Sequence, residues 1–143
     1  MIQKENCNKC RRKLIGMTLV EILIVVVVIG ILGSIAYPTF TQHVRQAHRQ
    51  TAKADMMKIQ LLLEKGYDNS HYSTVGIISG AVCLVCDSDE QRYEIDVTLS
   101  SSGYSITATP RVNFNQHLDV CEGGNYSELA LGQSGEALPA ECW

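Results

Sequence analysis

Two Cys-x-x-Cys pairs are the residues whose type and spacing most suggest chemistry. One pair is Cys7 and Cys10, and the other is Cys83 and Cys86. A single pair with this spacing can form a redox-active disulfide, and two pairs together can bind zinc. The sequence around Cys83 lacks the βα pattern of a thioredoxin site, so a local structural disulfide is the favoured interpretation there.

No other group of residues predicts a catalytic centre. The acidic stretch 87–90 could bind calcium, but it lacks the twelve-residue frame of an EF-hand and is expected to be a solvated turn. No GxSxG, P-loop or dinucleotide-binding motif is present. The histidines form no HExxH motif: His43, His48, His71 and His117. We therefore expect no enzyme activity, no cofactor and no metal site.

The elements that position these residues begin with a basic segment followed by an apolar one. Residues 1–16 carry five Lys or Arg and one Glu, a net charge of +4, which leaves −7 for the remainder of a chain whose net charge is −3. Residues 17–37 are long enough, as a helix, to cross a bilayer core of about 30 Å. Because basic residues stay on the cytoplasmic side, the remainder should face outward. Its acidic net charge gives no reason to expect nucleic-acid binding.

This topology decides what the cysteines can do. Cys7 and Cys10 would lie in the reducing cytoplasm, on the opposite side of the membrane from the second pair, so a shared zinc site is excluded. The outer four would lie in an oxidising compartment and form disulfides. Four cysteines allow three pairings, of which we expect two particular bridges: Cys83–Cys86 and Cys121–Cys142.

An ordinary cleaved signal peptide is the alternative for this segment. Ser34 and Ala36 make a weak small-x-small match for a cut after the apolar run. The helical pattern continues past that point, however, and the marked discontinuity falls earlier, before the apolar run, in residues 13–21. Glu21 is also unusual, since a carboxylate in the apolar layer costs roughly 3 kcal/mol unless it is paired. A position at the membrane interface would explain Glu21 only in part.

The segment resembles the amino-terminal signature of type IV pilins and type II secretion pseudopilins. The matching run is Gly16-Met-Thr-Leu-Val-Glu-Ile-Leu-Ile-Val-Val-Val-Val-Ile-Gly-Ile-Leu. The resemblance implies that prepilin peptidase cuts after Gly16, removing leader 1–16, and N-methylates Met17, where Phe is more common. Thr18 and Glu21 match the assembly positions, and Pro38 matches a helix-kinking proline.

The tail is similar to that of PilE-type minor pilins. These have a Tyr-x-x-x-Ala-x-Pro strand and a pattern of cysteines and glycines like this one: Tyr104-Ser-Ile-Thr-Ala-Thr-Pro110, Cys121, Leu129-Ala-Leu-Gly-Gln-Ser-Gly135 and Cys142-Trp143. The resemblance implies a minor pilin, inserted in the inner membrane and then drawn into a surface pilus for motility, adhesion or DNA uptake. Its partners would be other pilin subunits, prepilin peptidase and the pilus assembly machinery of the inner membrane.

Glu21 is expected to act in assembly. After cleavage its carboxylate could pair with the new amino group of Met17, four residues away in the same helix or in a neighbouring subunit. Such pairing would select the register of an incoming subunit. Gly30, Gly33 and Pro38 have two open interpretations: a weak point that kinks or unwinds on assembly, or close packing of helices through small residues.

The expected fold class is α+β, with a transmembrane and assembly helix at 17–38 and a periplasmic globular domain at 39–143. Residues 39–66 predict an amphipathic helix whose buried positions share a three-four spacing: Val44, Ala47, Thr51, Ala54, Met57, Leu61 and Leu62. Its basic residues, 45–58, could contact acidic surfaces of neighbouring subunits, but a solvated face is the favoured interpretation.

The remainder, 91–143, predicts a small antiparallel sheet and a disulfide-closed loop. Residues 92–99 and 104–109 alternate polar and apolar side chains around the turn 100–103, which indicates a β-hairpin. Residues 126–131 predict a third strand, followed by a turn and a short last segment. The sheet packed on the helix matches the type IV pilin fold that the resemblance implies.

Three rivals remain at this point. A type II secretion pseudopilin is the nearest rival. Cys121 and Cys142 argue against it, because pseudopilins more often stabilise the corresponding region with calcium than with a disulfide. A second is an enzyme or binding domain on a simple anchor, against which the 16–21 signature speaks. A third is a membrane-anchored DNA receptor at the pilus tip, which would need a local basic patch.

Overall fold

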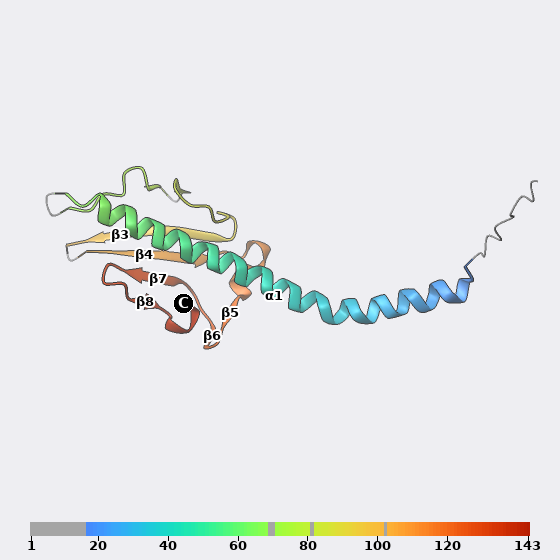
Figure 1. Cartoon of the computed structure of the whole chain (residues 1–143). Helices are drawn as coiled ribbons and strands as arrows, with labels where there is room; N and C mark the ends of the chain where they lie inside the picture. The colour runs from blue at the N-terminus through green and yellow to red at the C-terminus, as the bar shows by residue number, and fades with distance from the viewer. Residues whose placement is uncertain (1–16, 69–70, 81, 102) are drawn as a thin grey trace, which may run out of the picture. The chain divides into compact units, whose positions relative to one another are not determined.

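The computed structural model describes residues 17–68, 71–80, 82–101 and 103–143, so the leader, Gly16, Cys7 and Cys10 lie outside the described residues. The chain divides into two compact units, the first ending at Tyr37 and the second spanning Pro38–Trp143. One α-helix, α1 (Leu19–Lys65), runs through both units (Figure 1). It contains Pro38 and ends where the amide of Gly66 donates to the carbonyl of Leu62.

In the first unit, the helix is apolar and its side chains are exposed throughout. It is the helix in the described part of the chain that is long and apolar enough to cross a membrane. Apart from the chain neighbours and the adjacent helix backbone, no described residue places an atom within 4 Å of where a Cβ on Gly30 or Gly33 would stand, so the helix surface around both glycines is open in the described structure. Whether these glycines unwind or pack against another helix stays a prediction, as does a kink at Pro38.

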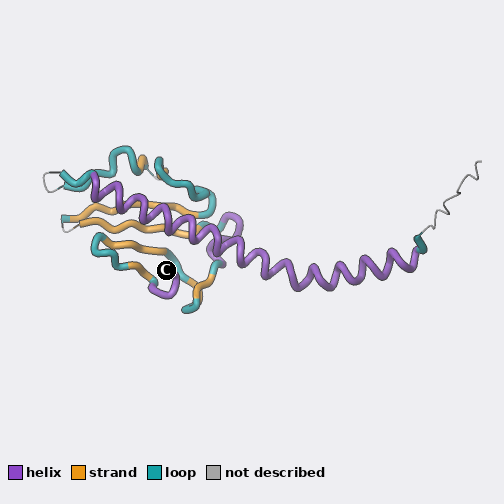
Figure 2. The backbone as a smooth tube through the Cα atoms, viewed as in Figure 1, coloured by secondary structure: helices purple, strands orange, loops and turns teal. Residues whose placement is uncertain are grey.

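In the second unit, α1 packs across one face of a four-stranded antiparallel sheet (Figure 2). The spatial order is β3-β4-β7-β8, from four strands: β3 (Tyr93–Ser100), β4 (Gly103–Pro110), β7 (Leu129–Gly132) and β8 (Ala137–Leu138). The predicted hairpin is confirmed, with Val97 opposite Ile106. The third strand begins at Leu129, three residues later than predicted, while the Tyr126 side chain lies in the core.

The described residues of the second unit also form four short strands and two 3₁₀ helices, which were not predicted from the sequence. They form the hairpins β1 (Ile78–Ser79) with β2 (Val82–Cys83) and β5 (Val120–Cys121) with β6 (Gly124–Asn125), and the helices η1 (Asn113–Leu118) and η2 (Ala140–Cys142). Two-residue strands carry too little alternation to be recognised in a sequence.

The face that α1 turns to the sheet differs from the predicted one. Its buried positions are Arg49, Ala52, Lys53, Asp55, Met56, Ile59 and Leu63. Four of the residues predicted to be buried are exposed instead: Ala47, Ala54, Met57 and Leu61. The prediction was wrong because α1 carries two apolar stripes, and the buried one also contains charged side chains that the sequence pattern assigned to solvent.

Candidate functional site

Thr18 caps the start of α1. Its hydroxyl oxygen accepts a hydrogen bond from the backbone amide of Glu21 at 3.2 Å. Thr-x-x-Glu at a helix start is the capping-box pattern, in which the Thr side chain satisfies one of the helix's unpaired amides. The same two residues were predicted to act in assembly only, although the capping pattern is present in the sequence. A local role for Thr18 is therefore established, while an assembly role for Glu21 remains a prediction.

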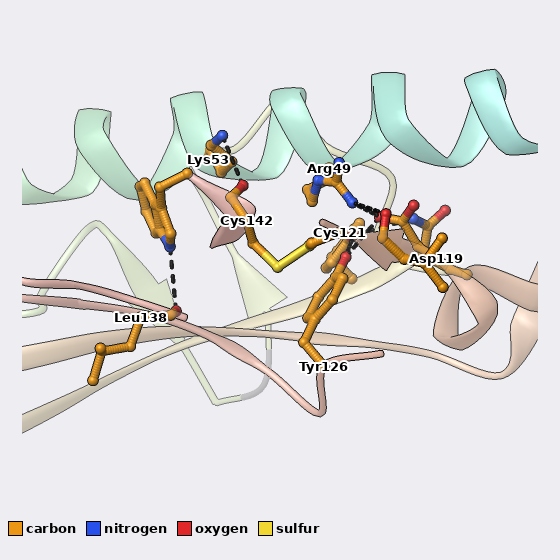
Figure 3. The surroundings of a disulfide bond; sticks show 11 residues. Arg49, Lys53, Asp119, Cys121, Tyr126, Leu138 and Cys142 are labelled. Carbon is orange, nitrogen blue, oxygen red and sulfur yellow. Dashed lines mark hydrogen bonds and ion pairs between the residues drawn. A yellow bond between two sulfur atoms is a disulfide. The ribbon is translucent and has the colours of Figure 1, made fainter. Parts of the chain in front are cut away.

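The bridge Cys121–Cys142 joins β5 to η2, with the two Cα atoms 5.1 Å apart (Figure 3). It confirms the predicted pairing. Closing a loop of this length contributes about 3 kcal/mol to stability in the chain-entropy account. The bridge therefore fixes the carboxyl-terminal segment beside α1.

Lys53 of α1 holds the same segment from the other side. Its ammonium group donates to the carbonyl of Cys142 at 3.0 Å and lies 5.5 Å from the centre of the Trp143 ring. The Trp143 indole donates in turn to the carbonyl of Leu138 (Figure 3). Burial, and then the nearby Arg49 guanidinium, lower the pKa of Lys53 below its ordinary value.

Arg49 anchors the segment before β5. Its Nη1 donates to the Asp119 carboxylate at 2.7 Å and to the carbonyl of Val120 at 3.0 Å. Asp119 also accepts from the hydroxyl of Tyr126, whose oxygen lies 2.6 Å from that of Tyr93. The predicted solvated basic face is thus wrong for Arg49 and Lys53, because their charged ends reach partners beneath the helix.

The bridge Cys83–Cys86 closes a tight loop next to the sheet, also as predicted. The neighbouring loop is held by Asp55 of α1, whose carboxylate accepts from the amides of Asp87 and Ser88. The buried Asp55 side chain thus positions this loop, a role that was not predicted from the sequence. The loop is therefore held against α1 through hydrogen bonds from its backbone amides.

The acidic side chains of that loop pair with cations of the chain. Asp87 lies 3.2 Å from Lys58, and Asp89 lies 3.7 Å from Arg92. Within the described residues, no three His, Cys, Asp or Glu side chains are placed to hold a metal ion. The stretch is a turn, as predicted, but the charges of Asp87 and Asp89 are partly neutralised by these ion pairs.

Basic and aromatic residues gather around η1, and we call this set the η1 cluster: Arg45, His48, Arg92, Arg111, Phe114 and His117. Arg92 donates to Gln116, which donates to the carbonyl of Arg45. The Arg92 guanidinium lies 4.8 Å from the Phe114 ring, which is 59% exposed. The pKa of His48 is lowered by burial and then by Arg92, while Asp89 acts in the opposite direction.

Two family profiles match the chain. The profile described as "Type IV minor pilin ComP, DNA uptake sequence receptor" covers residues 38–125. The profile described as "Prokaryotic N-terminal methylation motif" covers residues 11–37. Together they span the apolar segment and most of the globular unit, including η1.

Curated relatives carry the name "Type II secretion system core protein G". The one from Escherichia coli (strain K12) is 30% identical over 124 residues, which is 85% of this chain and 83% of the relative. The one from Vibrio cholerae is 29% identical over 131 residues, covering 90% and 86%. The one from Klebsiella michiganensis is 35% identical over 123 residues, covering 85% and 77%. No solved structure gives a significant match.

These relatives fit the pseudopilin alternative, but they do not support it better than the profiles support a minor pilin. The capped apolar helix, the sheet that its second half covers and the disulfide-closed segment agree with both. The profile that matches more than half of the chain decides between them: the chain belongs to the type IV minor pilin family.

Proposed function

We propose that this minor pilin is cleaved after Gly16, N-methylated at Met17, held in the inner membrane by the start of α1 and then assembled into a surface filament through α1. The methylation profile over residues 11–37 supports the processing steps. The globular unit would face the periplasm and later the outside. Other pilin subunits and the assembly machinery of the inner membrane would be its partners.

The observation that carries this proposal is an apolar stripe on the outer face of α1. In the globular unit this stripe consists of exposed side chains on the side of the helix opposite the sheet: Phe40, Ala47, Ala54, Met57 and Leu61. A bilayer core needs about 20 helical residues, and α1 has 47. Lipid therefore cannot cover the whole stripe, and helices of neighbouring subunits are the partners that fit.

Filament purification tests the proposal. Intact mass and amino-terminal sequencing of sheared surface filaments should find a methylated chain that begins at Met17. Met57→Glu and Leu61→Glu should remove the chain from filaments while leaving it processed and folded in membranes, because both side chains are exposed. The matched control is Val75→Glu, which adds the same charge at an exposed apolar residue outside α1.

Two outcomes would end the filament proposal. One is a chain that still carries residues 1–16 in the sheared filaments. The other is normal incorporation of both Met57→Glu and Leu61→Glu. A processed chain found only in membranes would favour a pseudopilin or an assembly initiator.

Binding of DNA by the globular unit is our second proposed function. The family profile is described as a DNA uptake sequence receptor, and the basic residues of the η1 cluster would supply the local positive charge that such a role requires. Exposed Phe114 beside Arg92 offers a stacking surface next to positive charge. Glu94 and Asp89 neutralise part of this charge, and the acidic net charge argues against DNA binding elsewhere on the domain.

Fluorescence anisotropy with a labelled DNA duplex tests this second function on the full chain in a zwitterionic detergent. Arg111→Gln should weaken binding and reduce its salt dependence, since each lost phosphate contact lowers the salt slope by about one. Lys65→Gln, at an exposed cation outside the η1 cluster, is the control and should change neither. Equal effects of the two changes would rule out binding at the η1 cluster.

A further inference from the structure

A groove of about 450 Å³ lies beyond the end of α1, where three loops of the globular unit meet. This volume falls within the range of small-ligand sites. Its described lining comes from residues 67, 71 and 72 after α1, from residues 99–101 and 103 around the β3–β4 turn, and from residue 133 after β7. The side chains that matter for recognition are Tyr67, His71, Tyr72, Ser100, Ser101 and Gln133.

The rings of Tyr67 and Tyr72 line the groove, and the Tyr104 ring packs against Tyr72 from the core. The rings of Tyr67 and Tyr72 have centres 4.6 Å apart, and Tyr72 meets Tyr104 edge-on at 4.9 Å. Tyr104 is buried, so the inner end of this row is fixed in the core. Tyr67 is 49% exposed at the outer end. Its ring is therefore a supported but accessible apolar surface.

Hydrogen bonds hold the polar groups beside these rings. The hydroxyl of Tyr104 donates to Glu64 at 2.6 Å, and Gln133 Nε2 donates to the hydroxyl of Tyr72 at 2.6 Å. Gly103, at φ +143°, leaves room for the Gln133 side chain, which a Cβ at position 103 would meet. The backbone of Gly103 thus places Gln133 across the groove before any ligand arrives.

The chemistry of this groove suits a neutral ligand with hydroxyl groups and a flat C–H face. Among the described lining residues, His71 is the one that can carry a positive charge, whereas Glu64 brings a carboxylate to the same row of tyrosines. Phosphate would therefore find little attraction here. Amide and phenol groups together can both donate to and accept from hydroxyls.

We propose that this groove binds a pyranose unit of a neutral oligosaccharide. The C–H face of the sugar would pack on Tyr67, and its hydroxyls would bond to Gln133 and Tyr72. Such a site would give the pilin a glycan-binding activity that is separate from filament assembly and from the η1 cluster.

Saturation-transfer NMR tests this proposal with the full chain in phosphocholine micelles, because detergents with sugar heads would compete. The probes are cellotriose and the trimer of N-acetylglucosamine, whose β-linked rings present flat C–H faces. We expect transfer from protein to the ring protons of at least one probe. Tyr67→Ala should weaken binding about fivefold or more by removing the aromatic contact, and Tyr67→Phe should retain it.

Two further variants locate the site. Gln133→Ala should weaken sugar binding, whereas Phe114→Ala, at an exposed aromatic residue of the η1 cluster, should leave it unchanged. Thermal unfolding shows whether each variant is folded. Absence of transfer to both probes, equal binding by Tyr67→Ala and the wild type, or competition by a DNA duplex would each overturn the proposal.

Discussion

The guanidinium of Arg49 and the carboxylate of Asp119 lie 2.7 Å apart, with their side chains only 7% and 0% exposed. The pair links α1 to the segment before β5. Removing one partner of a buried ion pair leaves the other charge without compensation. Arg49→Met should therefore lower the free energy of unfolding by roughly 3–5 kcal/mol, measured by chemical denaturation of the full chain in micelles.

The double variant Arg49→Met with Asp119→Leu separates the cost of an unpaired charge from lost packing. Because it leaves no buried charge, it should recover much of the stability that Arg49→Met loses. A double variant as unstable as the sum of the two single changes would contradict this account. In that case packing and the bond from Tyr126 to Asp119 would matter more than charge.

The two disulfides should contribute unequally to stability. The cysteines of the Cys121–Cys142 bridge are 21 positions apart in the sequence, and those of the Cys83–Cys86 bridge are only 3 positions apart. By loop-closure entropy, replacing the first pair with Ser should cost about 3 kcal/mol, and replacing the second about 2 kcal/mol. Thermal unfolding of both double-Ser variants measures this order. The reverse order would show that contacts of the Cys83 loop, including those with Asp55, outweigh chain entropy.

The effect of the Glu21 charge on assembly can be measured separately from the role of this position in the capping box. Gln can replace Glu at this position of a capping box, but it carries no charge. If the Glu21 carboxylate pairs with the amino group of Met17 during assembly, Glu21→Gln and Glu21→Ala should both insert and be processed yet be missing from sheared filaments. Incorporation of Glu21→Gln at the wild-type level would show that helix capping, and not charge, is required.

Alkaline pH should unfold the globular unit as its buried tyrosines ionise. Burial raises the pKa of both Tyr104 and Tyr126, and their hydrogen bonds to Glu64 and Asp119 act in the same direction. In the unfolded chain, tyrosine ionises near an ordinary pKa of about 10. The folded state then binds more protons than the unfolded one, so the free energy of unfolding falls as pH rises above about 10.

Phenolate absorbance and circular dichroism, followed together, check this pH dependence. A late-ionising group of tyrosines should titrate along with the loss of secondary structure. Tyr126→Phe should reduce the size of that late group. Ionisation of all tyrosines near pH 10 with the fold intact would contradict the expectation.

The sequence was sufficient wherever a short-range pattern carries the signal. Alternation along residues 92–99 and 104–109 predicted the hairpin, and the short spacing of Cys83 and Cys86 favoured a local bridge. It was insufficient for the groove and the η1 cluster. Both join residues far apart in the chain, as in the contact of Gln133 with Tyr72.

By itself, the sequence determined the apolar segment and the α+β class, because periodicity and composition act within one element. Four cysteines left three pairings open, and the tertiary structure decided among them by placing Cys121 beside Cys142. Only the tertiary structure decided which face of α1 is buried. Spacing offered Met57 and Leu61 as readily as Met56 and Ile59, and it assigned Arg49 to solvent. Long cationic side chains can lie beneath a helix when distant partners, here Asp119 and the Cys142 carbonyl, receive their charged ends.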